Sequence, residues 1–289
     1  MNNDVLNMNR FGRYLVTDIK NAVSKFGISL IVMVTISVTG YLLAGFFSLL
    51  VGAQWHSLGI VGRSTLFGLA TLVVFLSAPA KIFGFLTDKR EGSAYLMVPV
   101  SPMEKTISMV IVTCIVLPFV FFAFYFSFDQ IICLIDPKCG DSIILTMNEG
   151  IFKLNNSWAS FPVELQNTLP QDLFNKWPWL YLDDMAQVLL IFLYGAIIFK
   201  SSKPAKTVGC LILISIALSM IFTPIMTHGA YEKFKTAMET GMTPDQIMEM
   251  FPFYSWMLKH AVLMDCITDT VVNVGLFLLI WRRVKRITH

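Results

Sequence analysis

The chain has 289 residues, of which 55% are hydrophobic and 14% are charged, and its mean hydropathy is +0.66. Soluble globular proteins carry about 25% charged residues, so the composition excludes the class of soluble enzymes. A helix needs about 20 consecutive apolar residues to cross a hydrocarbon core of about 30 Å. Several stretches of this kind occur, and they predict an all-α polytopic membrane protein that forms a single membrane domain over 1–289.

Six apolar stretches are candidate transmembrane helices, in chain order 26–55, 64–80, 106–128, 185–199, 207–227 and 261–281. The second continues past Lys81 for a further apolar turn. The fourth is the shortest, and Trp179 to Tyr181 lengthen it at the membrane interface. An even number of spans places both termini on the same side of the membrane.

The distribution of Lys and Arg fixes the predicted orientation. With six spans, 15 of the 22 basic residues but only five of the 19 acidic residues fall on the side of the termini. We therefore expect both termini in the cytoplasm and the chain in the bacterial inner membrane. A basic inner face is expected of any such protein, so it is no evidence for nucleic-acid binding.

Residues 8–25, which precede the first span, have the periodicity of an amphipathic helix. Met8, Phe11 and Leu15 share one face of a helical wheel, and Arg10 and Arg13 share the opposite face. Such a helix lies at a membrane interface. Two interpretations stay open: a simple positively charged anchor, or an elbow helix along the inner leaflet.

The inner segment 87–105 has a charged cluster, an apolar patch and a new helix start. Ser101 suits the N-cap of that helix, Pro102 its first position and Glu104 the capping-box partner. One interpretation is a solvated loop; the other, which suits the apolar patch better, is a docking surface for a cytoplasmic partner. The candidate partner-binding residues are Lys89, Arg90, Glu91, Tyr95, Leu96 and Met97.

Two outer segments are long enough to fold on their own. Residues 134–183 are too many for a tight connection and predict a small periplasmic insertion. In 229–259, Gly241 suits a helix end and Thr243 with Pro244 suits a helix start. This second segment therefore predicts a periplasmic pair of short helices.

Sequence motifs for nucleotide binding, zinc proteolysis or serine hydrolysis do not occur, and the four histidines lack metal-ligand spacing. We therefore predict no catalytic residue, metal or cofactor. Polar residues within spans usually face a bundle interior or a water-filled cavity, so Asp265, Asp269 and Asn273 are candidates for a substrate pathway. Ordinary interfacial placement of Asp265 is the alternative. An aspartate-dependent intramembrane enzyme is a further one, although Asp183 and Asp184 lack the third carboxylate typical of diphosphate-binding prenyltransferases.

Three of the five cysteines fall in predicted spans, where they suit the role of small core residues. Cys133 and Cys139 instead fall at the outer end of the third span and in the loop after it. That side is an oxidising compartment, and Pro137 favours a turn between the two residues. We predict a disulfide between Cys133 and Cys139.

Two segments resemble bacterial ABC-type permeases: Asn9-Arg10-Phe11-Gly12-Arg13-Tyr14-Leu15 before the first span, and 92–105 after the second. The order of elements resembles the permease subunits of the type V exporter class along the whole chain. The resemblance implies a non-catalytic subunit that couples a separate ABC ATPase to substrate movement, together with a second permease chain as a homodimer or with a related protein. The alternative class is a structural or sensory membrane subunit that transports nothing.

Overall fold

The computed structural model describes residues 7–52, 55, 58–87, 92, 98–136, 139–146, 178–227, 256 and 260–288. Every secondary-structure element within these residues is a helix. Five of the helical segments are long and apolar enough to cross a membrane: 8–50, 60–87, 102–135, 203–221 and 263–287. The expected fourth span is not among the five, but all of its residues except Phe199 lie in a 21-residue helix, α9 (Pro178–Ile198).

The chain divides into two compact units. The first comprises 1–148, 185–206 and 273–289, and the second comprises 149–184 and 207–272. Helices α1 (Met8–Val34), α2 (Ile36–Leu50) and α3 (Ile60–Phe83) lie in the first unit. Most of α10 (Lys203–Thr227) and the first part of α14 (Ala261–Thr288) lie in the second.

The predicted amphipathic segment 8–25 is helical, and its helix continues without a break through Phe26 to Val34. Asn7 starts α1 by accepting hydrogen bonds from the backbone N–H groups of Asn9 and Arg10. The buried face of α1 includes Tyr14, Asp18, Ala22 and Phe26, at four-residue spacing. A carboxylate in this stripe departs from the purely apolar face that the helical wheel predicts.

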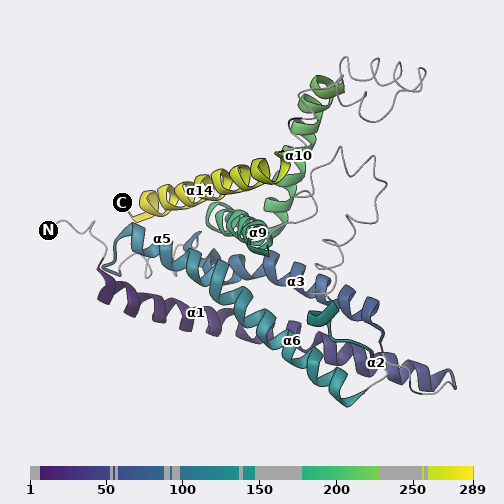
Figure 1. Ribbon diagram of the computed structural model, residues 1–289. Coiled ribbons are helices and arrows are strands. Elements are labelled where there is room, and N and C mark those ends of the chain that lie inside the picture. Colours follow the sequence, from purple (N-terminus) through teal and green to yellow (C-terminus); the bar gives the residue numbers. More distant parts are fainter. Residues whose placement is uncertain are drawn as a thin grey trace, which may run out of the picture. The chain divides into compact units, whose positions relative to one another are not determined.

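One long helical rod follows the inner segment. It consists of α5 (Pro102–Ile111), the π-helical turn η2 (Val112–Val116) and α6 (Leu117–Ile135) (Figure 1). The predicted start is confirmed, because Ser101 and Glu104 form a reciprocal capping box with Pro102 in the first turn. Pro118 is the second residue after the π turn and lacks the N–H that would bond the carbonyl of Cys114.

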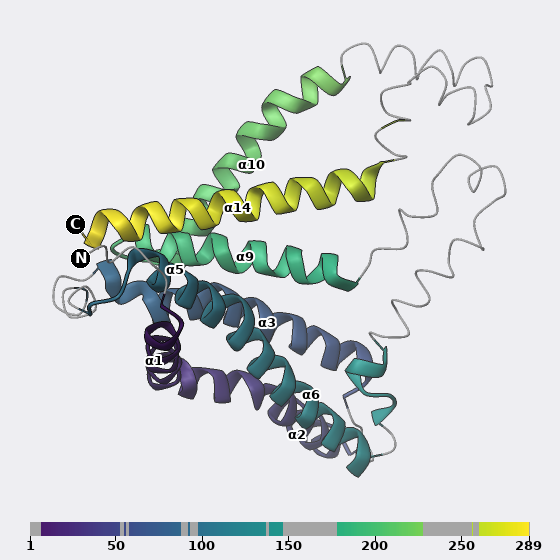
Figure 2. The ribbon, with the colours of Figure 1, turned by 60° about the vertical axis from the view of Figure 1, so that its left-hand side comes forward.

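The core of the first unit is rich in aromatic rings. Phe67 of α3 lies 5.0 Å from Tyr125 and 5.3 Å from Phe126 of α6, measured between ring centroids. Leu189 and Leu193 of α9 and Ile280 of α14 complete this core, and all three are buried. Helix α1 packs against both α3 and α6, and α3 packs against α6 through these rings (Figure 2).

Candidate functional site

The first functional candidate is the attachment of α5 to the beginning of α1. Glu104 accepts hydrogen bonds from the backbone N–H groups of Asn7, at 2.8 Å, and Ser101, at 3.0 Å. Arg10 reaches the same carboxylate with its Nε at 3.1 Å and its Nη2 at 2.9 Å. The Glu104 side chain is fully buried, whereas the Arg10 side chain is 32% exposed. We call Asn7, Arg10, Ser101 and Glu104 the Glu104 clamp.

A second polar contact between the same helices lies about two turns further along α1 and one turn further along α5. The hydroxyl of Ser108 donates to Asp18 Oδ2 at 2.6 Å, and the two residues are buried. Lys105 is also buried, and the charge of Asp18 acts on its ammonium group. Buried charges persist only with partners of this kind, so Asp18 fixes the register of α1 against α5.

The 3₁₀ turn η1 (Gly84–Thr87) connects α3 to the predicted partner-binding segment. The Lys25 ammonium of α1 lies 3.4 Å from the ring centroid of Phe85, a cation–π contact. Lys203 donates to the carbonyl of Gly84, and Thr87 donates to the carbonyl of Phe199 at 3.5 Å. The turn η1 is thus held by α1 and by the connection between α9 and α10.

All six predicted partner-binding residues, from Lys89 to Met97, lie outside the described residues. Gly92, within the same segment, is buried against η1, where a Cβ would lie 2.9 Å from the carbonyl oxygen of Leu86. A groove of about 570 Å³ lies between α1 and residues 98–100 of the predicted partner-binding segment 87–105. Its walls are Val98 to Val100 on one side and, on α1, residues that include Arg10, Arg13 and Thr17.

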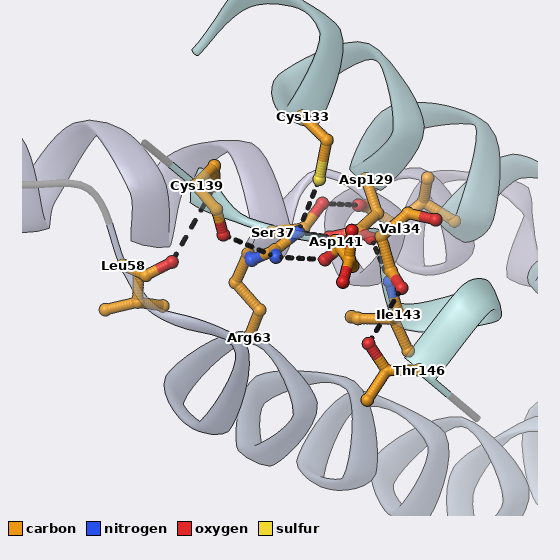
Figure 3. Close-up of polar contacts among 11 residues, drawn as sticks. Val34, Ser37, Leu58, Arg63, Asp129, Cys133, Cys139, Asp141, Ile143 and Thr146 are labelled. Atoms are coloured by element: carbon orange, nitrogen blue, oxygen red, sulfur yellow. Dashed lines mark hydrogen bonds and ion pairs between the residues drawn. The ribbon is translucent and has the colours of Figure 1, made fainter. Parts of the chain in front are cut away.

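A second polar cluster lies at the other end of the α5–α6 rod, centred on Arg63 of α3 (Figure 3). Arg63 Nη1 lies 2.8 Å from Asp129 Oδ1 and 2.8 Å from Cys133 Sγ. Its Nη2 donates to the backbone carbonyls of Cys139, at 2.9 Å, and Asp141, at 2.6 Å. The side chains of Arg63 and Asp129 are 0% and 1% exposed. We call Arg63, Asp129, Cys133, Cys139 and Asp141 the Arg63 cluster.

The Arg63 cluster also orders the chain that follows α6. Asp129 Oδ2 accepts the backbone N–H of Ile143 at 2.7 Å, and Gly140 adopts a positive φ of 76° between two residues whose carbonyls face Arg63. Glycine adopts this conformation without the steric cost that a side chain imposes. A single arginine therefore joins α3, α6 and the 139–143 segment.

Cys133 and Cys139 are both free thiols, and the predicted disulfide stays a prediction. Cys133 is partly exposed, whereas Cys139 is buried with its thiol 3.7 Å from the carbonyl oxygen of Leu58. Burial raises the pKa of Cys139 to about 11, Arg63 opposes the rise, and a hydrogen bond with the Cys133 thiol is among its lesser causes. The two sulfurs thus occupy different environments within one cluster.

The acidic pathway candidates meet in part. In the second unit, Asp269 is 8% exposed and its carboxyl is hydrogen-bonded to that of Asp184. The charges of Asp265 and Asp183 also act on it. Asn273 belongs to the first unit. Among the described residues, these carboxylates and the other His, Cys, Asp and Glu side chains form no group of three suited to a metal ion.

The predicted spans place Arg63 just before the second span and Asp129 just after the third, and they give neither residue a role in a site. The sequence pattern assigns Glu104 to the helix cap without its ion pair to Arg10. A signal for the Arg63 cluster was present, because Arg63 is the one Lys or Arg between positions 26 and 80 and the six-span topology places it at the same membrane boundary as Asp129.

No protein-family model, curated protein sequence or solved structure matches the chain.

Proposed function

We propose that this chain is the membrane-spanning permease subunit of an ABC-type transporter, and that a separate ATPase moves its helices through residues 87–105. The observation that carries the proposal is the double attachment of this segment to α1. Lys25 holds η1, the turn that leads into the segment, through Phe85, and Arg10 holds the end of the segment through Glu104. A force applied between these two points acts on α1 at both.

The helices beyond the segment suit the transmission of movement. The rod from Pro102 to Ile135 has 34 residues and is about 51 Å long at 1.5 Å per residue, longer than the hydrocarbon core of about 30 Å. It begins directly at the Glu104 clamp. A displacement there is therefore passed along the whole rod rather than absorbed in a flexible connection.

The second inner connection supports the same interpretation. Lys203 and the carbonyl of Phe199 both contact η1, so the connection between α9 and α10 is tied to the start of segment 87–105. A partner that binds this one segment has mechanical access to α1, α3, α5 and the α9–α10 connection. This arrangement favours one docking segment over two independent ones.

The remaining parts of the proposal follow from the predicted topology. Helix α9 is the fourth of six spans, both termini are cytoplasmic, and a second permease chain completes the pathway in the bacterial inner membrane. Asp265, Asp269 and Asn273 line the pathway on α14, and the burial of Asp269 supports this role. The chain needs no cofactor of its own, because ATP is used by the partner.

The proposal is tested by mild detergent extraction of the tagged chain, followed by identification of co-purified ATPases. Replacing Tyr95 and Leu96 together with Ala removes the apolar anchor, and we expect it to release the ATPase. The matched control replaces Leu42 and Leu43 of α2, whose exposures are 53% and 55%, and we expect it to retain the ATPase. Both proteins must elute as monodisperse species for the comparison to count.

An ATPase that stays bound to the Tyr95→Ala/Leu96→Ala protein would place the contact elsewhere and contradict the proposed docking segment. A wild-type chain that co-purifies with no ATPase under conditions that preserve its oligomer would favour the structural or sensory subunit. A third variant, Glu104→Gln, weakens the clamp without changing the docking residues. We expect it to keep the ATPase but to lower the stimulation of ATP hydrolysis.

A further inference from the structure

Cys133 and Cys139 both contact the guanidinium of Arg63 (Figure 3). Cys133 projects from α6 with its sulfur 2.8 Å from Arg63 Nη1. Cys139 follows on the next segment, its carbonyl bonded to Arg63 Nη2 and its thiol turned toward the carbonyl of Leu58. Arg63 thus holds two cysteines, six positions apart in sequence, in one cluster.

The two thiols differ in the properties that decide the order of a thiol–disulfide exchange. Attacking thiols are partly exposed and stand beside a cationic side chain, whereas buried thiols in apolar surroundings are inert until a partner sulfur is presented to them. Cys133 is partly exposed and accepts a hydrogen bond from Arg63. Cys139 is 2% exposed, and the pKa of about 11 keeps it protonated.

We propose that Cys133 and Cys139 form a redox-active pair in which Cys133 is the attacking thiol and Cys139 the resolving thiol. The co-reactant is a disulfide, either of a small thiol such as glutathione or of a thiol oxidase. This inference goes beyond the proposed transport function and does not depend on it. It also goes beyond a structural disulfide, because it assigns a different role to each sulfur.

The reaction balances in two exchanges. The Cys133 sulfur, having lost its proton, attacks one sulfur of the co-reactant; that S–S bond breaks, and the departing thiolate takes up a proton. The Cys139 sulfur then loses its proton and attacks Cys133, and the second half of the co-reactant leaves as a thiol. The protein loses two hydrogens and gains one disulfide, and the co-reactant is reduced to two thiols.

The experiment uses the full chain in detergent, in a background in which Cys114, Cys210 and Cys266 are Ala, so that other thiols do not react. Reduced protein is treated with glutathione disulfide, and intact mass is followed with time. We expect the background protein to lose two hydrogens without a stable adduct. We expect Cys139→Ser to retain one glutathione, on Cys133, and Cys133→Ser to retain none.

Three results would overturn the proposal. One is a stable adduct on Cys139 in the Cys133→Ser protein at the rate seen for Cys133 in the reciprocal variant. Another is an unchanged mass of the background protein in excess glutathione disulfide. The third is an equal rate of glutathione addition to Cys133 in the Cys139→Ser protein with and without Arg63→Lys, because loss of the guanidinium hydrogen bond should slow this reaction. Size-exclusion profiles of the serine variants, which change one atom each, show whether they are folded.

Discussion

The two polar clusters at the ends of the α5–α6 rod are built differently. Glu104 and Asp129 are 25 positions apart, about 38 Å along the helix axis. In the Glu104 clamp the arginine is 32% exposed and two backbone N–H groups share the carboxylate. In the Arg63 cluster both charges are excluded from solvent.

This difference indicates at which end of the rod the polar contacts can rearrange at lower cost. A buried ion pair is expensive to break, because the remaining charge has no water to solvate it. In the Glu104 clamp the remaining carboxylate is also buried, but it keeps two backbone N–H donors and Arg10 already reaches water, so the loss is smaller. The Arg63 cluster therefore fixes α3 to α6. The Glu104 clamp holds the end of the proposed docking segment 87–105 and is the end of the rod at which rearrangement costs less.

We expect the largest effect from Asp129→Ala. It leaves the Arg63 guanidinium buried without its carboxylate and removes the acceptor of the Ile143 N–H, so we expect a loss of about 3–5 kcal/mol in the free energy of unfolding. The measurement is denaturant unfolding in mixed micelles. Asp141→Ala is the matched control, since the bond from Arg63 ends on the backbone carbonyl of that residue. Equal losses in both variants would show that the ion pair does not stabilise this end.

Arg10→Ala tests the Glu104 clamp and should have a smaller effect. Glu104 keeps the N–H groups of Asn7 and Ser101, so we expect a loss of about 2 kcal/mol, the range for hydrogen bonds to charged groups. Arg13, exposed and one turn further along α1, is the control, and its replacement by Ala should change stability by less than about 0.5 kcal/mol. A larger loss for Arg10→Ala than for Asp129→Ala would reverse the comparison.

We expect the smallest effects from two glycine substitutions, which test the backbone conformation at Gly140 and at Gly12. Gly140 has a φ of 76° and open space where a Cβ would lie, so Gly140→Ala should cost about 1 kcal/mol from conformation alone. Gly12, in the interior of α1, also has open space at that position. Gly12→Ala should instead stabilise the protein by up to about 1 kcal/mol, because Ala is the better helix former. Thermal unfolding in detergent with a circular dichroism readout compares the two, and a shift of the same sign in both would contradict the assignment.

The local parts of this structure could be predicted from the sequence, and the distant pairs could not. The helix start at Pro102 could be predicted from Ser101 and Glu104, because a capping box depends on two residues only three positions apart. Arg10 and Glu104 are 94 positions apart, and Arg63 and Asp129 are 66 apart. No periodicity connects such positions, so the order of spans gave the only indication that the second pair would meet.

Hydropathy also predicted the long apolar helices but not their internal irregularities. Thr35 interrupts the helix between α1 and α2, and the π turn interrupts the third span. Both lie within continuous apolar sequence, where composition carries no information about the helical hydrogen-bond pattern. The short stretch 185–199 posed the opposite difficulty, since its helix begins seven residues earlier and includes Asp183 and Asp184.

The π turn changes the angular position of every side chain that follows it on the α5–α6 rod. Buried side chains recur at every fourth position along it: Lys105, Met109, Thr113, Leu117, Phe121, Tyr125 and Asp129. In a regular α-helix with 3.6 residues per turn, each step of four winds the stripe about 40° around the axis. The wider turn at 112–116 takes up an extra residue and offsets part of that drift. Deleting one residue within it would rotate Asp129 by about 100° relative to Glu104, so the number of residues between the two carboxylates is as strictly constrained as their identity.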